Sequence, residues 1–200
     1  MHYKRRAGYE AKSEIFGRVC VKLGLTPNVL TALSFCFSIL AGALFWRREF
    51  LLGTAALLLN ALTDMLDGAT ARAGKMGTVF GGILDHVSDR YAEFFVLMGI
   101  LLSGAVHPGW ALFAQFGIII ASYTRAAAES IGKLETCAVG IAGRLEKFAL
   151  LVAGGILQEF IPQFEPLMYA LILMGTISYI TSIQRLVFAK KQLGDRQEPE

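Results

Sequence analysis

Residues 50–63 read FLLGTAALLLNALT, and this uncharged run is followed directly by DMLDGATAR at residues 64–72. A continuous Leu- and Ala-rich run is typical of a helix that crosses a bilayer, whereas a strand of a membrane barrel would alternate apolar and polar residues over about ten positions. The sequence therefore predicts a membrane helix that ends in acidic residues.

The composition of the whole chain agrees with this local pattern. Of the 200 residues, 54% are hydrophobic and 18% are charged, with a mean hydropathy of +0.52; an average soluble domain has about 25% charged residues. A soluble globular protein is therefore excluded. We predict an all-α integral membrane protein whose six transmembrane helices lie near residues 28–46, 50–63, 83–103, 109–127, 148–158 and 166–184.

The placement of the cations predicts the orientation in the membrane. With six spans, Arg47 and Arg48 fall on one side and all other Lys and Arg residues fall on or near the opposite side. Since cytoplasmic loops carry the excess of Lys and Arg, both termini and the acidic end of the second span are expected to be cytoplasmic. The protein would then be a multi-pass component of the cell membrane.

The two ends of the chain differ from the apolar body. Residues 9–23 carry Ile15, Val19 and Leu23 at helical spacing beside several cations, which is typical of an amphipathic helix in the membrane interface. No cleaved signal peptide and no disulfide framework are expected. We expect three segments: a cytoplasmic N-terminal segment with this helix at 1–26, a six-span domain at 27–189, and a polar tail at 190–200.

Four aspartates stand where a membrane protein normally avoids charge. Asp64 and Asp67 are three residues apart and Asp85 and Asp89 are four apart, so each pair shares a helical face. A charge at the bilayer centre costs roughly 2.5 to 3.5 kcal/mol, so such groups usually serve a site. A short loop at 68–78 would bring both pairs together near the cytoplasmic surface. Oxygen ligands without His or Cys favour Mg²⁺ or Mn²⁺, and four carboxylates suffice for two ions.

Other interpretations of this region remain open. Gly77 and Gly81 have the spacing of a GxxxG helix-packing face, although their place between two acidic pairs favours close approach to a ligand. Arg90 and Glu93 are expected to form a structural ion pair or to support the metal ligands from behind, rather than to act in catalysis. Intramembrane aspartates also occur in divalent-cation transporters, which stays as a distant alternative.

The residues between 64 and 89 form a pattern with fixed spacing. The pattern Asp64-x₂-Asp67-Gly68-x₂-Ala71-Arg72-x₈-Gly81-x₃-Asp85-x₃-Asp89 resembles the signature of the CDP-alcohol phosphatidyltransferase family at every fixed position. Pro27-Asn28, at the start of the first span, and the six-span plan extend the resemblance. It implies a homodimeric membrane enzyme that transfers a phosphatidyl-type group from a CDP-lipid to an alcohol and releases CMP.

The resemblance also implies roles for individual residues. Asp64, Asp67 and Asp85 would be metal ligands, and Asp89 would contribute to a second metal and act as the general base. The CDP-lipid would be bound by Asn28, Gly68, Ala71, Arg72, Thr78 and Gly81. A hydroxyl is a weak nucleophile at neutral pH, so a carboxylate that accepts its proton fits the chemistry.

Three arginines bear on the identity of the acceptor alcohol. Arg125, Arg144 and Arg185 stand at three cytoplasmic helix ends, where the positive-inside rule alone would place cations. If they converge, they would suit an acceptor that carries a phosphate. The arrangement resembles the phosphatidylinositol phosphate synthase branch, including its archaeal archaetidylinositol counterparts, and implies inositol 1-phosphate as the acceptor. That branch usually has lysine at Arg125 and a basic residue at Ala127, so glycerol 3-phosphate or serine stays open as an alternative.

Overall fold

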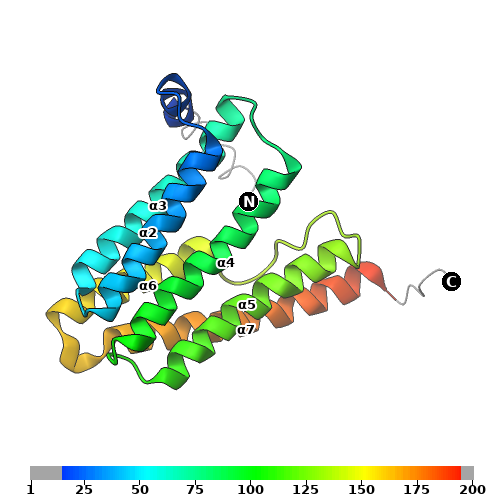
Figure 1. Cartoon of the computed structure of the whole chain (residues 1–200). Coiled ribbons are helices and arrows are strands. Elements are labelled where there is room, and N and C mark those ends of the chain that lie inside the picture. Colours follow the sequence, from blue (N-terminus) through cyan, green and yellow to red (C-terminus); the bar gives the residue numbers. More distant parts are fainter. Residues whose placement is uncertain (1–14, 195–200) are drawn as a thin grey trace. The chain divides into compact units, whose positions relative to one another are not determined.

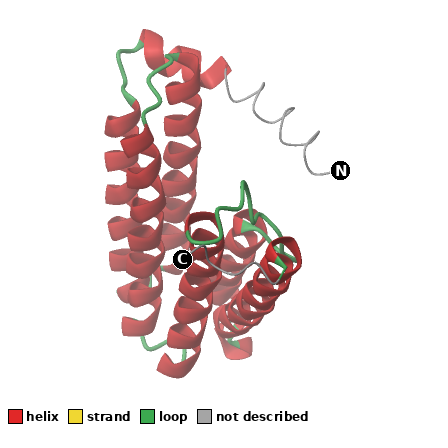
Figure 2. Cartoon of the chain, turned by 90° about the vertical axis from the view of Figure 1, so that its right-hand side faces the viewer, coloured by secondary structure: helices red, strands yellow, loops and turns green. Residues whose placement is uncertain are grey.

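The computed structural model describes residues 15–194, and every regular element in this range is a helix (Figure 2). This confirms the all-α class. After a helical segment at residues 15–22, the elements are α2 (Pro27–Trp46), α3 (Phe50–Ala73), α4 (Val79–Leu102), α5 (Pro108–Ser130), α6 (Arg144–Phe160), the short 3₁₀ helix η1 (Pro162–Phe164) and α7 (Pro166–Leu193). The chain forms two compact units, residues 1–99 and 100–200, which we describe separately.

Local sequence signals account for where several helices begin. The Thr26 hydroxyl accepts a hydrogen bond from the Val29 N–H at 3.4 Å, and Pro27 occupies the first helical position of α2. α5 begins in the same way, because His107 Nδ1 accepts from the Gly109 N–H at 3.1 Å and Pro108 follows His107. The start of α2 agrees with the expected start of the first span at Pro27. The turn expected at 107–109 lies earlier, at residues 103–107, because Pro108 and Gly109 already belong to α5.

One expected boundary was wrong. The connection between the second and third spans was placed at 68–78, but residues 68–73 continue α3 and the connection comprises only residues 74–78. Alanines at this end of α3 favour the helix, so that Gly68 alone does not break it. At the other end of the chain, α7 extends to Leu193, so the first residues of the polar tail expected at 190–200 belong to this helix. Residues 9–14 of the expected amphipathic helix and residues 195–200 of the tail lie outside the described residues.

Within residues 15–194, four segments are long and apolar enough to cross a membrane: α2, α3, α5 and Pro162–Leu193. The other two expected spans differ from these for physical reasons. α4 carries four charged residues, Asp85, Asp89, Arg90 and Glu93, in its first two-thirds, and α6 has only 17 residues. The chain is thus an integral membrane protein with several apolar helices.

In the first unit, polar and small side chains bring the helices together. α2 packs along α3 (Figure 1), and buried Asn60 donates to both the carbonyl and the hydroxyl oxygen of Ser34 at 2.8 and 2.9 Å. Hydrogen bonds of this kind join helices where lipid provides no hydrophobic driving force. α4 approaches α2 at Gly99, where an added Cβ would collide with the backbone of Gly42. The approach therefore depends on glycine.

Replacing Gly99 with Leu is expected to destabilise the protein by about 1 to 3 kcal/mol or more. The new side chain would clash with the backbone of Gly42, which cannot move aside as a flexible side chain could. The midpoint of thermal unfolding in detergent should fall. Gly82→Leu in the same helix is the matched control, since a Cβ there meets no atom within 4 Å. Equal midpoints for the two variants would contradict the packing described.

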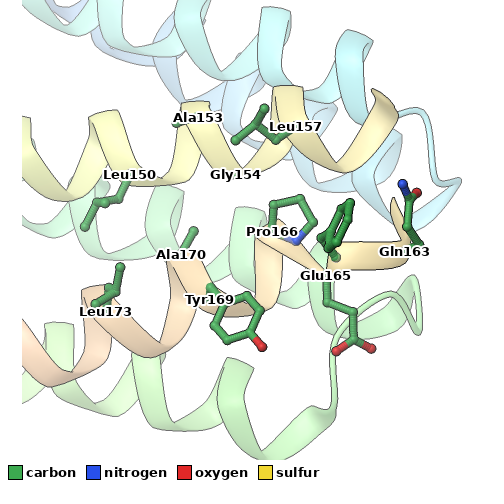
Figure 3. Close-up of a pocket in the computed structure, with 11 residues that line it drawn as sticks. Leu150, Ala153, Gly154, Leu157, Gln163, Glu165, Pro166, Tyr169, Ala170 and Leu173 are labelled. Atoms are coloured by element: carbon green, nitrogen blue, oxygen red, sulfur yellow. The ribbon is translucent and has the colours of Figure 1, made fainter. Parts of the chain in front are cut away.

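In the second unit, α7 packs against both α5 and α6. Thr124 of α5 and Ser182 of α7 form a buried hydrogen bond of 2.8 Å between their hydroxyl oxygens. A groove of about 540 Å³ lies where α6, η1 and the start of α7 meet, and Figure 3 shows its lining. Apart from Glu165, Gln163 and the Tyr169 hydroxyl, that lining is apolar, so the groove lacks the convergent polar groups of a reaction site.

Candidate active site

Three of the four aspartates converge in the first unit. One carboxylate oxygen from each of Asp64, Asp67 and Asp85 lies within 4.8 Å of the other two. The short connection at 74–78 makes α3 and α4 neighbours, which brings the last third of α3 close to the first third of α4. Two oxygens bound to one Mg²⁺ ion at about 2.1 Å lie at most about 4.2 Å apart, so these hard oxygen ligands are near the spacing that a shared Mg²⁺ or Mn²⁺ ion requires.

Asp67 is the buried member of the group, and a residue of α2 holds it. The Thr31 hydroxyl donates to Asp67 Oδ2 at 2.9 Å. This contact leaves the other carboxylate oxygen available for a ligand and fixes the rotamer of the side chain. Sequence reasoning missed Thr31. A signal was present, because this polar residue stands one turn after Pro27 in a helix that contains no charged residue.

Asp89 is not part of the three-carboxylate group. Its Oδ2 lies 3.9 Å from Arg90 Nη2, and its side chain is 13% exposed. Arg90 also contacts Glu93, with 2.9 Å between Nη1 and Oε2. The expected ion pair between Arg90 and Glu93 is therefore confirmed. The roles of Asp89 as a second-metal ligand and as the general base stay predictions.

The small residues after Asp67 leave room for the side chain of Arg72. Gly68, Ala71 and Arg72 lie in the last two turns of α3, and a Cβ added at Gly68 would lie 3.4 Å from Arg72 Nη1. The guanidinium thus lies over Gly68, on the turn that follows Asp67. An exposed planar fork of donors beside a carboxylate group is suited to a phosphate.

Thr78 and Gly81 form the start of α4. The Gly81 N–H donates to the Thr78 hydroxyl oxygen at 2.9 Å, which is the hydrogen bond of a helix N-cap. A Cβ at Gly77 would meet no atom within 4 Å, so Gly77 and Gly81 do not form a helix-packing face in the described chain. Asn28 is exposed in the first turn of α2, three residues before Thr31 and on the same face.

The helical segment at 15–22 contacts the same end of α3. Gly17 is buried, and a Cβ there would collide with the backbone of Ala69. Ile15, Phe16 and Val19 are at least half exposed. The described part of the expected interfacial helix therefore has one small face toward α3 and an apolar face that no described residue covers.

In the second unit, Arg125 and Arg185 form hydrogen bonds with other parts of the protein. Arg125 Nε donates to Glu129 Oε1 at 2.8 Å. Arg185 donates from Nε to the carbonyl of Val139 at 3.1 Å and from Nη1 to the carbonyl of Ala121. Arg144 is the exposed first residue of α6. Arg125 and Arg185 both act electrostatically on Cys137, which places them around one point of the α5–α6 loop, residues 131–143.

Cys137 provides a test of how this loop is packed. Burial raises the pKa of its thiol above the usual range, and the nearby Glu129 carboxylate acts in the same direction. The thiolate is the reactive form, and free thiols titrate near about pH 8.5. In a Cys20→Ala, Cys36→Ala variant, maleimide labelling of Cys137 should thus be slow at neutral pH and accelerate only at higher pH. The unfolded chain is the control, and equal labelling rates at neutral pH would contradict the buried position.

Comparisons with known proteins give the class. The model of the CDP-alcohol phosphatidyltransferase family matches residues 24–183. The chain is 35% identical over 180 residues to an archaetidylinositol phosphate synthase of Pyrococcus horikoshii, covering 90% of this chain and 92% of the relative. It is 32% identical over 181 residues to a phosphatidylinositol phosphate synthase of Mycobacteroides abscessus, covering 83% and 78%.

Solved structures agree with the sequence comparisons. The crystal structure of Mycobacterium tuberculosis phosphatidylinositol phosphate synthase with CDP-DAG bound has a TM-score of 0.81 and 29% identity, and the match covers 94% of this chain and 98% of that one. A second crystal structure of that protein, in complex with manganese and citrate, also has a TM-score of 0.81.

The chain therefore belongs to the CDP-alcohol phosphatidyltransferase family, and it is an enzyme of that family. This family membership favours a transferase over the alternative of a divalent-cation transporter.

Proposed function

We propose that this enzyme transfers a phosphatidyl-type group, diacylglycerol phosphate or archaeol phosphate, from a CDP-lipid to a hydroxyl of inositol 1-phosphate and releases CMP in phospholipid biosynthesis. The observation that carries the proposal is the 35% identity, over nine-tenths of the chain, to an archaetidylinositol phosphate synthase. The similarity to a structure with CDP-DAG bound supports the CDP-lipid as donor. Glycerol 3-phosphate and serine are the competing acceptors.

In the proposed reaction the four carboxylates bind the metal ions, and one of them also accepts a proton. Asp64, Asp67, Asp85 and Asp89 would hold two Mg²⁺ or Mn²⁺ ions, which supply charge neutralisation and polarisation at the diphosphate. A new bond forms between the acceptor oxygen and the lipid-side phosphorus, and the bond from that phosphorus to the CMP oxygen breaks. Asp89 accepts the hydroxyl proton during the attack. Thr31 keeps Asp67 in the orientation that leaves its second oxygen available.

The CDP part of the donor would be bound by Asn28, Gly68, Ala71, Arg72, Thr78 and Gly81. Gly68 and Ala71 add little bulk around the end of α3, and Arg72 offers its donors to a phosphate. The hydroxyl oxygen of Thr78, which already accepts from Gly81, keeps its own O–H as a donor. These contacts are to the shared part of every CDP-lipid, so they fit either ester or ether chains.

The arrangement in the membrane follows from the charges. We infer six spans, with α4 and α6 as the third and fifth, within a transferase domain at 27–189. Both termini and the active site are cytoplasmic in this proposal, because nearly all Lys and Arg residues then face the cytoplasm. Residues 1–26 and 190–200 flank the domain, and the functional unit is a homodimer.

A kinetic comparison of acceptors tests the proposal. The purified enzyme is supplied with one CDP-lipid and with inositol 1-phosphate, glycerol 3-phosphate, serine or free inositol, and CMP release is measured. Inositol 1-phosphate should give the largest kcat/KM. A preference for glycerol 3-phosphate would keep the reaction class and change the acceptor, while a preference for serine or free inositol would also remove the phosphate-binding role of Arg125, Arg144 and Arg185.

Substitutions of Arg144 distinguish a role in phosphate binding from a role as a signal for membrane topology. A charge-assisted hydrogen bond contributes about 1.5 to 3 kcal/mol, so Arg144→Gln should raise the KM for inositol 1-phosphate roughly 10- to 150-fold while the KM for CDP-lipid stays nearly unchanged. Arg144→Lys should also raise the acceptor KM, since Lys cannot form a bidentate contact. If Arg144→Lys is kinetically identical to the wild type, Arg144 serves topology alone.

A further inference from the structure

The carboxylate of Glu129 lies at the junction of α5 and the α5–α6 loop. Its Oε1 accepts two hydrogen bonds, one from Arg125 Nε at 2.8 Å and one from the Cys137 N–H at 2.8 Å. Arg125 belongs to α5, and Cys137 lies in the middle of the loop that leads to Arg144. Glu129 Oε1 thus connects Arg125 with the loop that leads to Arg144, and both arginines are proposed to bind the acceptor.

The rest of the loop is held by α7. Gln184 Oε1 accepts from the Ile141 N–H at 2.9 Å, and Arg185 Nε donates to the Val139 carbonyl. Gly140 lies between these anchors with φ +143°, where a Cβ would collide with the side chain of Thr181. The loop is therefore held at residues 137, 139 and 141. Backbone hydrogen bonds from Gly132 and Leu134 attach its first part to α5, and the Glu129 side chain attaches its middle, at Cys137.

The geometry at Arg125 leaves donors for a ligand. Glu129 engages Nε, and the guanidinium carries four further N–H donors on its two terminal nitrogens. The Arg125 side chain is 39% exposed and the Glu129 side chain 30% exposed, so the pair is within reach of a soluble molecule. Charge-assisted bonds fix orientation as well as adding attraction.

From these contacts we infer that Glu129 is a positioning residue for the acceptor phosphate: it orients Arg125 and holds the loop that ends at Arg144. This inference rests on the proposed function. Glu129 does not touch the acceptor itself, because a carboxylate would repel a phosphate. Its effect reaches the acceptor through Arg125 and the loop, and leaves CDP-lipid binding unchanged.

The test measures KM for inositol 1-phosphate and for CDP-lipid in three variants. Glu129→Ala removes both hydrogen bonds and should raise the acceptor KM roughly 10-fold or more, with the CDP-lipid KM unchanged. Glu129→Gln keeps an oxygen for the Cys137 N–H but loses the charge that holds Arg125, so its effect should be in the same direction and smaller. Glu135→Gln, an exposed acid of the same loop, is the matched control and should leave both KM values unchanged.

A double substitution shows whether Glu129 acts through Arg125. In an Arg125→Gln background, Glu129→Gln should add little to the acceptor KM, because the group it orients is absent. If Glu129→Gln raises the acceptor KM equally in both backgrounds, or raises the two KM values together, the inference is wrong. If Glu129→Ala fails to fold, the Glu129→Gln cycle alone decides between these outcomes. The proposed function fails separately, when the wild type does not use inositol 1-phosphate or Arg125→Gln leaves its KM unchanged.

Discussion

Excess EDTA is expected to abolish CMP release, with a loss of roughly 10³-fold or more. One oxygen from each of Asp64, Asp67 and Asp85 lies within 4.8 Å of the others, and such a group repels the diphosphate of a CDP-lipid unless a cation lies between them. Activity should return on adding Mg²⁺ or Mn²⁺ beyond the chelator.

A variant of the three-carboxylate group is compared with the effect of metal removal. Asp67→Asn removes the charge of the buried member while its remaining carbonyl oxygen can still accept from Thr31. It should therefore weaken metal binding and CDP-lipid binding together, and shift the concentration of Mg²⁺ needed for half-maximal activity upward. Full activity of the wild type in excess EDTA would remove the metal site from this account.

Asp89→Asn is expected to lower turnover roughly 10²- to 10⁴-fold, which is the usual contribution of a general base. Because Asp89 lies outside the three-carboxylate group, the KM for CDP-lipid should change much less than in Asp67→Asn. The measurement is a comparison of kcat and of both KM values in the two variants. An equal loss of CDP-lipid binding in both variants would mean that Asp89 is only a metal ligand and does not act as the base.

Local signals in the sequence predicted most of the helical elements. The start of α2 at Pro27 and the start of α5 at Pro108 follow from residues that are adjacent in the chain. The end of α3 was placed too early because Gly68 looked like a break, whereas the alanines after it sustain the helix to Ala73. α4 has 24 residues, but its charged residues lower its average hydropathy, so a search for membrane-spanning helices based on apolarity does not detect it.

Contacts between distant residues could not be predicted from spacing. The convergence of Asp64 and Asp67 with Asp85 was expected, because a short connection joins their helices. Thr31, in contrast, reaches Asp67 across 36 positions, and Arg185 reaches Ala121 across 64. A polar residue in an apolar helix signals that a partner exists but does not say which one. The arginines illustrate this, since Arg125 and Arg185 have protein partners that charge counting alone did not reveal.

The central claim is the transfer of an intact phosphatidyl-type group to a phosphorylated polyol. The most direct measurement is mass spectrometry of the lipid formed when the purified enzyme, CDP-diacylglycerol or CDP-archaeol, inositol 1-phosphate and Mg²⁺ are mixed, with CMP quantified in the same sample. The account predicts a lipid that carries one inositol phosphate, formed in equal amount with CMP and absent when inositol 1-phosphate is omitted. CMP release without that lipid, or a lipid product formed only with serine or free inositol, would contradict it.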